Sequence, residues 1–175
     1  MKYNYLIYIG RFQPFHNGHK LVVDTMLEEV DIAIVCIGLS EWEDKNPYDY
    51  TTRLHFFTHT YSNIHHLHIF PLADQEDDRV WVESIVTLPY IFESSEIILY
   101  CGDRKHDSAI KVISEHINMF TGKHLSFREV SRDIVPLSWT EIRSTLREKW
   151  YKTIRDAVPP EVSELLEKWV PSLDF

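Results

Sequence analysis

Short apolar runs alternate with helical patterns along most of this chain, and this alternation limits the folds that it can form. The runs are typical of buried β-strands and lie at Tyr5–Ile9, Ile32–Ile37, His68–Leu72, Ile97–Cys101 and Leu125–Val130. Helical patterns lie between them, at Gly18–Val30, Tyr50–Tyr61, Arg79–Phe92 and Ser108–Phe120. Strand–helix alternation with right-handed crossovers gives a parallel sheet that is covered by helices on both faces. We therefore predict an α/β, Rossmann-like fold with a mostly parallel, five-stranded sheet.

The pattern changes after the fifth apolar run. Pro136 precedes a helical pattern at Ser138–Lys149, and a short helix is expected after Pro159-Pro160 because proline is tolerated in a first helical turn. No internal repeat or flexible linker interrupts the 175 residues. We expect one domain, residues 1–175, whose C-terminal part from about residue 137 is a small helical appendage.

Composition narrows the class of protein. The formal net charge is −9, so a general nucleic-acid binder, which needs a broad basic surface, is not expected. No apolar stretch is long enough to cross a membrane and no signal-peptide pattern opens the chain, which predicts a cytoplasmic protein. Cys36 and Cys101 lie in apolar runs and are expected to be free thiols. An acidic protein still binds a small anion where a pocket is locally positive.

The five glycines exclude two common phosphate-binding loops. They stand at Gly10, Gly18, Gly38, Gly102 and Gly122. Neither G-x-G-x-x-G nor G-x-x-x-x-G-K-[ST] can be written from them. A nucleotide bound by this chain needs another device, and the strongest candidate is the segment GRFQPFHNGH, from Gly10 to His19.

This segment joins the first apolar run to the first helical pattern. His16 and His19 are three residues apart, so both fall on one helix face and can point at one phosphate chain. The helix N-terminus adds unpaired N–H groups, and Gly18 lets the backbone approach a ligand. In the alternative reading Asn17 caps the helix and the histidines are surface residues. A zinc site on the histidine pair is a further alternative, although no third ligand follows at a suitable spacing.

A second set of phosphate-binding groups lies in LSWTEIR, residues 137–143. Ser138 with Glu141 reads as a capping box, which needs no ligand. The same helix start offers backbone amides, the hydroxyls of Ser138 and Thr140 and, one turn on, the guanidinium of Arg143. The residues alone support the two readings equally.

Three weaker motifs occupy other turns. The turn signal Asn46-Pro47-Tyr48 stands before Arg53, which is early in the next helix. Trp81 is either a core residue or a platform for a ring. The segment Gly102-Asp103-Arg104-Lys105-His106-Asp107 follows the fourth apolar run. It is either a close-approach turn for a ligand or a solvated charged turn.

Together these motifs resemble those of the nucleotidyltransferase superfamily, in which H-x-G-H and a C-terminal [IL]-S-x-T-x-I-R grip one nucleoside triphosphate. Within it the chain is most similar to nicotinamide-mononucleotide (NMN) adenylyltransferases, of the archaeal type or the adenylyltransferase half of bacterial Nudix fusions. The similarity rests on GRFQPFHNGH, KNPY…TTR, the Trp81-Val82 pair and GDRKHDS, and it spans most of the chain. The chain departs from the family where Asp77-Asp78-Arg79 replace an asparagine before the tryptophan, and at Trp139, where a smaller residue is usual.

The resemblance implies the nucleotidyltransferase fold and adenylyl transfer from ATP to NMN, which gives NAD and pyrophosphate. The NMN phosphate would attack the α-phosphorus in line without a covalent intermediate, so catalysis would consist of positioning and charge neutralisation. Mg²⁺ would be held mainly by the phosphates, and no protein ligand is assigned to it.

The resemblance also implies roles for particular residues. The implied catalytic residues are His16, His19, Arg11 and Arg143. The implied ATP contacts are Gly10, Arg11, Phe12, Gly18, Gly102, Asp103, Lys105, Ser138, Thr140 and Arg143. The implied NMN contacts are Asn46, Tyr48, Arg53 and Trp81, with Trp81 stacked on the nicotinamide ring.

Other functions stay open at this point. The acceptor can instead be nicotinic acid mononucleotide, phosphopantetheine or an alcohol phosphate, although a flat cationic ring suits the indole of Trp81 best. A non-catalytic NAD- or NMN-sensing module and a zinc-dependent hydrolase are the alternatives from other classes. The expected partners are ATP, NMN and NAD, with no nucleic acid and no membrane, and a homo-oligomer is compatible with the resemblance.

Overall fold

The structure is a computed structural model that describes residues 5–39, 46–89, 96–102, 115, 124–130 and 155–169. Within these ranges the backbone alone is described at residues 78, 96–102, 124–130 and 169. The helical patterns at 108–120, of which only Glu115 is described, and at 138–149 lie outside these ranges.

A five-stranded sheet forms the centre of the described part. Its strands are β1 (Tyr5–Gly10), β2 (Ile32–Leu39), β3 (Leu67–Ala73), β4 (Glu96–Gly102) and β5 (His124–Val130). The spatial order is β3-β2-β1-β4-β5, and every neighbouring pair is parallel. The predicted α/β fold with a parallel, five-stranded sheet is therefore confirmed.

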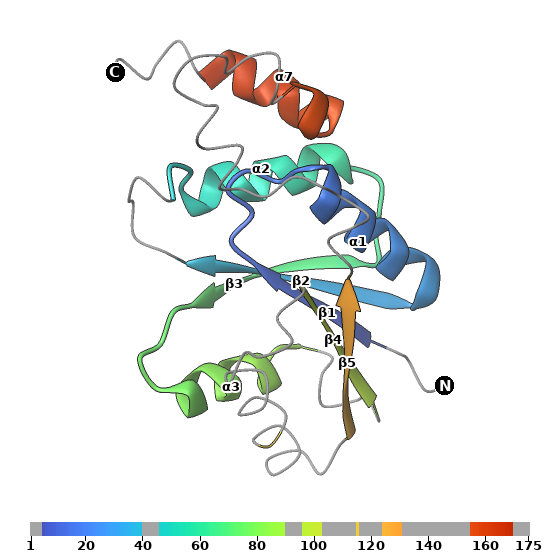
Figure 1. Cartoon of the computed structure of the whole chain (residues 1–175), viewed down its shortest axis with the longest axis vertical. Coiled ribbons are helices and arrows are strands. Elements are labelled where there is room, and N and C mark those ends of the chain that lie inside the picture. Colours follow the sequence, from blue (N-terminus) through green and yellow to red (C-terminus); the bar gives the residue numbers. More distant parts are fainter. Residues whose placement is uncertain are drawn as a thin grey trace.

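Helices cover both faces of this sheet (Figure 1). They are α1 (Asn17–Glu29), α2 (Tyr50–Thr60), α3 (Asp78–Val86) and α7 (Pro160–Trp169). Helix α3 lies on the opposite face from α1 and α2. The predicted end of α3 at Phe92 is wrong because the helix ends at Val86, where the N–H of Thr87 closes the last turn on the carbonyl of Glu83. None of the described helices is long and apolar enough to cross a membrane.

Strand side chains divide between two cores because successive residues point to opposite faces. On β1, Leu6 and Tyr8 join the cluster beneath α1 and α2, whereas Tyr5 and Ile7 join the cluster beneath α3. Strand β2 alternates in the same way. Its residue Cys36 is a buried free thiol, as predicted, and burial raises its pKa to about 12.

The C-terminal helix α7 packs over α2, on the side away from the sheet (Figure 1). Its residues Val162, Leu165 and Leu166 are buried in the same cluster as Phe56 and Phe57 of α2. The short helix expected after Pro159-Pro160 is therefore present, and it is built into the main core.

The sheet order identifies the edge at which a ligand is expected. From β1 the chain moves outward through β2 to β3, and it then returns to β4 on the other side of β1. Ligands of such sheets bind at the carboxyl ends of the strands that flank this reversal. The flanking strands pair as far as Tyr8 and Tyr100, and Gly10 and Gly102 each lie two residues further on.

Candidate active site

The loop between β1 and α1 is held in place by packed aromatic rings. Phe12 has a φ of 51°, a left-handed conformation that is uncommon for a non-glycine residue. Its buried ring makes edge-to-face contacts with Tyr8, His19 and Phe57, with centroids 4.9–5.3 Å apart. A Cβ on Gly10 would lie 2.7 Å from the Phe12 ring, so glycine is required here by the packing of the loop. The packing of the Phe12 ring thus fixes the path of the loop backbone.

Gln13 joins this loop to the segment before α2. The side chain is buried, and its Nε2 donates a hydrogen bond to the carbonyl of Tyr48 at 2.8 Å. The N–H of Tyr48 donates in return to Oε1 of Gln13 at 2.9 Å. The ring of Tyr48 is buried in the main core against Phe56. One amide side chain thus holds two loops, 35 residues apart, in a fixed relation.

The two histidines of the H-x-G-H motif cap the helix that they begin. Nδ1 of His16 accepts hydrogen bonds from the N–H groups of Gly18 and His19, and Nδ1 of His19 accepts one from the N–H of His16. The two rings stack with centroids 3.6 Å apart. The alternative in which Asn17 caps the helix is wrong: Asn17 is the first helical residue, and its side chain donates to the carbonyl of Asp156 at 3.2 Å.

This cap defines which atoms the histidines offer to a ligand. Burial lowers the pKa of His16 to about 4, and burial together with the nearby His16 lowers the pKa of His19 well below its usual value. Both rings are therefore neutral near pH 7. Because each Nδ1 accepts a hydrogen bond, the one ring proton of each histidine is assigned to Nε2. The pair presents two uncharged N–H donors at the start of α1.

Arg53 has a structural position beneath this loop. The side chain is fully buried, and Nη1 donates to the carbonyls of Arg11 at 2.9 Å and Gly38 at 2.7 Å, while Nε donates to the carbonyl of Asp49 at 3.2 Å. Burial and the neighbouring Arg11 lower the pKa of Arg53, and the carboxylates of Asp49 and Asp74 oppose this effect. Arg53 thus fixes the carboxyl ends of β1 and β2, and its contact with a substrate stays a prediction.

Arg11 extends along the same edge of the sheet. Its Nη2 lies 2.7 Å from Oδ2 of Asp74, the residue that follows β3, and both side chains are about half exposed. The stem of Arg11 passes over the end of β2, where a Cβ on Gly38 would lie 3.2 Å from Cδ of Arg11. A guanidinium that reaches solvent at the carboxyl edge of a parallel sheet is suited to bind an anion.

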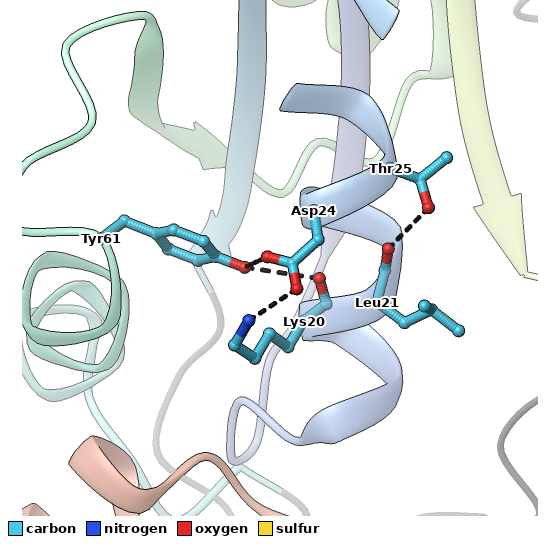
Figure 2. Close-up of polar contacts among 5 residues, drawn as sticks. All are labelled: Lys20, Leu21, Asp24, Thr25 and Tyr61. Atoms are coloured by element: carbon cyan, nitrogen blue, oxygen red, sulfur yellow. Dashed lines mark hydrogen bonds and ion pairs between the residues drawn. The ribbon is translucent and has the colours of Figure 1, made fainter. Parts of the chain in front are cut away.

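A polar network joins α1 to Tyr61 (Figure 2). Nζ of Lys20 lies 2.5 Å from Oδ2 of Asp24, and the hydroxyl of Tyr61 donates to Oδ1 of Asp24 at 2.9 Å. Tyr61 follows the end of α2, and burial and the Asp24 contact raise its pKa. The network joins the first two turns of α1 to the residue that follows α2.

The remaining predicted site residues divide between described and undescribed positions. Trp81 lies in the first turn of α3, half-buried against the cluster beneath that helix. Asn46 is partly exposed at the start of the segment that leads to α2. Gly102 ends β4 at the reversal of the strand order. Five predicted residues lie outside the described ranges: Asp103, Lys105, Ser138, Thr140 and Arg143.

Two functional side chains escaped the sequence reasoning. Gln13 stands inside the GRFQPFHNGH motif between Phe12 and Pro14, and a polar residue in this otherwise apolar stretch was the available signal. Asp74 lies in an acidic segment with no motif around it, so nothing in the sequence linked it to Arg11. Among the described residues, no group of three or more His, Cys, Asp or Glu side chains is placed to hold a metal ion.

The depressed histidine pKa values predict a pH-dependent stability. The unfolded chain protonates His16 from about pH 6.5 downward, whereas the folded protein resists protonation of His16 until about pH 4. The free energy of unfolding should therefore fall as the pH is lowered through this window, by up to about 3 kcal/mol from His16. Urea unfolding at several pH values measures this slope. His16→Asn, which keeps a capping residue, should flatten it, and His65→Asn, at an exposed histidine, should not.

The burial of Arg53 predicts a large effect on stability. Arg53→Ala removes three hydrogen bonds to backbone carbonyls and should lower the free energy of unfolding by about 2–4 kcal/mol. Arg79→Ala, at an exposed position in the first turn of α3, is the matched control and should change it by less than about 0.5 kcal/mol. Equal effects of the two substitutions in chemical denaturation would contradict the structural role of Arg53.

Comparison with known proteins places this geometry in a family. Residues 7–147 match the model of the cytidylyltransferase-like family. The nicotinamide-nucleotide adenylyltransferase of Methanospirillum hungatei is 27% identical over 169 residues, which cover 93% of this chain and 86% of that protein. That of Methanocorpusculum labreanum is 33% identical over 91 residues, which cover 50% of this chain and 54% of that protein. The chain thus spans about half the length of the latter relative.

A solved structure agrees with the fold. The bifunctional NMN adenylyltransferase/ADP ribose pyrophosphatase from Francisella tularensis superimposes with a TM-score of 0.66 at 20% identity, covering 97% of this chain and 50% of that one. The same enzyme was also solved in complex with AMP and a manganese ion. Because the family model extends from β1 past the LSWTEIR motif, this chain belongs to the cytidylyltransferase-like family.

Proposed function

We propose that this chain transfers the adenylyl group of ATP to NMN, giving NAD and pyrophosphate. The observation that carries the proposal is the reciprocal histidine cap, which uses both Nδ1 atoms as acceptors and leaves the two Nε2–H groups as donors at the carboxyl end of β1. The name of the Methanospirillum relative, which matches 93% of the chain, supports this choice of reaction. The proposal rests on the histidine cap together with the name of this relative.

The proposed mechanism is an in-line displacement at the α-phosphorus of ATP. The phosphate oxygen of NMN forms the new P–O bond while the bond to the bridging oxygen breaks, and pyrophosphate leaves with that electron pair. No side chain becomes bonded to phosphorus, so the protein lowers the barrier by orienting two anions and neutralising their charge. For this reaction, hydrogen-bond donors and cationic side chains on the protein matter more than a general base.

The chain's residues have separate tasks in this scheme. His19 and His16 donate from Nε2 to the phosphate oxygens, and the N-terminus of α1 adds partial positive charge. Arg11 supplies a full charge at the same edge. Arg143, Ser138 and Thr140 from the LSWTEIR motif, with Gly10, Gly18, Gly102, Asp103 and Lys105, complete the proposed ATP site. Asn46, Tyr48, Arg53 and Trp81 are assigned to the NMN side.

Mg²⁺ belongs to the proposal as a companion of ATP. A divalent ion accompanies AMP in a structure of the Francisella enzyme. Mg²⁺ keeps several waters and binds substrate phosphates with few protein ligands, so the proposal needs no dedicated metal site in this chain. When bound, it would neutralise phosphate charge, and no residue of this chain is assigned to hold it.

A coupled assay for NAD formation from NMN, ATP and Mg²⁺ tests the proposal. We expect NAD and pyrophosphate in equal amounts. Nicotinic acid mononucleotide, phosphopantetheine, and CTP with glycerol 3-phosphate run in parallel. Turnover with one of these pairs and none with NMN would keep the phosphate site and overturn the acceptor. Binding of NAD without any turnover would indicate a sensing module.

Loss of the His19 donor should slow the chemical step. We expect His19→Ala to lower kcat by about 10²-fold or more, the size found for removal of one donor to developing charge. A modest loss of stability is also expected, because His19 accepts a bond in the helix cap and packs on Phe12. Steady-state kinetics well below the unfolding midpoint separate the two effects. A variant with nearly normal kcat would remove His19 from the mechanism.

Loss of the Trp81 side chain should weaken binding of NMN more than binding of ATP. Trp81→Ala should raise KM for NMN several-fold more than KM for ATP, since an indole face stabilises a flat cationic ring. Val80→Ala, at the exposed neighbouring position, is the control and should leave both KM values unchanged. Equal increases for the two substrates would mark Trp81 as a core residue.

A further inference from the structure

Asp74 forms an ion pair with the guanidinium of Arg11, which the proposed function assigns to binding phosphate. Its Oδ2 lies 2.7 Å from Nη2 of Arg11. The two residues come from different strand ends: Arg11 follows β1 and Asp74 follows β3, with β2 between them. Arg11 therefore reaches across the end of β2, over Gly38, to make this contact.

Asp74 acts on two positive charges at this edge. Arg53 lies beneath Arg11 and donates to its carbonyl, and the charge of Arg11 disfavours the charged form of Arg53. The carboxylate of Asp74 favours the charged form of Arg53 and forms the ion pair with Arg11. Asp74 thus has the electrostatic role that an anionic ligand would have at the same two arginines.

The ion pair is suited to exchange. Its side chains are 46% and 50% exposed, and ion pairs exposed to this extent contribute little to stability. The contact joins Nη2 of Arg11 to one carboxylate oxygen, Oδ2 of Asp74. A phosphate group offers three oxygens and a higher charge, and it binds a guanidinium through two parallel hydrogen bonds. A polyphosphate therefore has the advantage over the Asp74 carboxylate at this guanidinium.

We propose that Asp74 is an internal competitor of the polyphosphate: its carboxylate holds the edge of Arg11 that a phosphate of ATP takes on binding. This inference rests on the proposed function, which places the triphosphate at Arg11. Such a competitor weakens binding of every anion that has to displace it, because only the fraction of the protein in which Arg11 is free of Asp74 can bind the anion.

The opposite role for Asp74 makes the opposite prediction. An acidic residue that holds Arg11 in its working orientation would strengthen polyphosphate binding, and its removal would weaken it. The sign of the change in affinity therefore distinguishes a competitor from a positioning residue.

The experiment is titration calorimetry of ATP with Mg²⁺, and separately of inorganic pyrophosphate, into the full chain and its variants. Asp74→Asn should lower Kd for both probes by roughly two- to fivefold, as expected for release from an exposed ion pair. Glu76→Gln, two residues away and exposed, removes the same charge without the Arg11 contact. It should change Kd by much less, because exposed charges at a distance are screened by salt.

A double-mutant cycle assigns the effect to Arg11. In an Arg11→Ala background, Asp74→Asn should leave Kd unchanged, since the competition has been removed. Weaker binding by Asp74→Asn, an equal effect of Glu76→Gln, or tightening that persists without Arg11 would each overturn the proposal. Thermal unfolding of each variant verifies that it is folded.

The two probes keep this inference separate from the proposed function. If pyrophosphate binding tightens in Asp74→Asn but the wild-type chain neither binds ATP nor forms NAD, the competition stands and the function falls. If the wild-type chain forms NAD but Asp74→Asn binds ATP more weakly, the function stands and the competition falls. If the wild-type chain binds neither ATP nor pyrophosphate, both the competition and the function are overturned.

Discussion

The buried guanidinium of Arg53 determines how the carboxyl edge of the sheet is arranged. Its Nη1 joins the carbonyl of Arg11, just beyond β1, to the carbonyl of Gly38 near the end of β2. A charge buried in this way is costly unless its donors are satisfied, so the carbonyls are held where the guanidinium needs them. The backbone of Arg11 is thereby fixed while its side chain stays half exposed. A rigid backbone with a movable charged end is what an exchangeable anion contact requires.

The histidine cap connects the stability of the first helix to the proposed chemistry. Each Nδ1 satisfies backbone N–H groups that the first turn of a helix leaves unpaired, which fixes both rings and their tautomer at once. Stacking against the partner histidine and packing against Phe12 and Phe15 exclude water from one side. The imidazoles are thus kept neutral by the same contacts that aim them, and they donate without carrying a charge that the helix N-terminus would oppose.

The sequence predicted the layers of this fold better than it predicted the contacts at the site. Five apolar runs became five parallel strands, because a strand covered on both faces is apolar throughout its length. The helix end at Val86 was missed because the apolar pattern continues beyond it. At the site, the motif identified the histidines but not their cap, since histidine is not among the usual capping residues. The Arg11–Asp74 and Gln13–Tyr48 contacts join residues 63 and 35 positions apart, and such pairs depend on strand order, which local patterns do not contain.

A chain with a net charge of −9 that binds a polyphosphate has to overcome repulsion near the site. At physiological salt, the effect of a carboxylate on the ligand is largely screened beyond about 8–10 Å. The charges nearest to the ligand therefore decide whether the site attracts or repels it. Among the residues that the structure describes at this edge, these charges are Arg11, Arg53 and Asp74, with two neutral imidazoles nearby. The carboxylate of Asp74 reduces the repulsion between the two guanidiniums when no ligand is bound. The same carboxylate lowers the affinity of the site for an anionic ligand. In the proposed reaction the protein has to release pyrophosphate as well as bind ATP, and the lower affinity would help because tight binding of both would slow turnover.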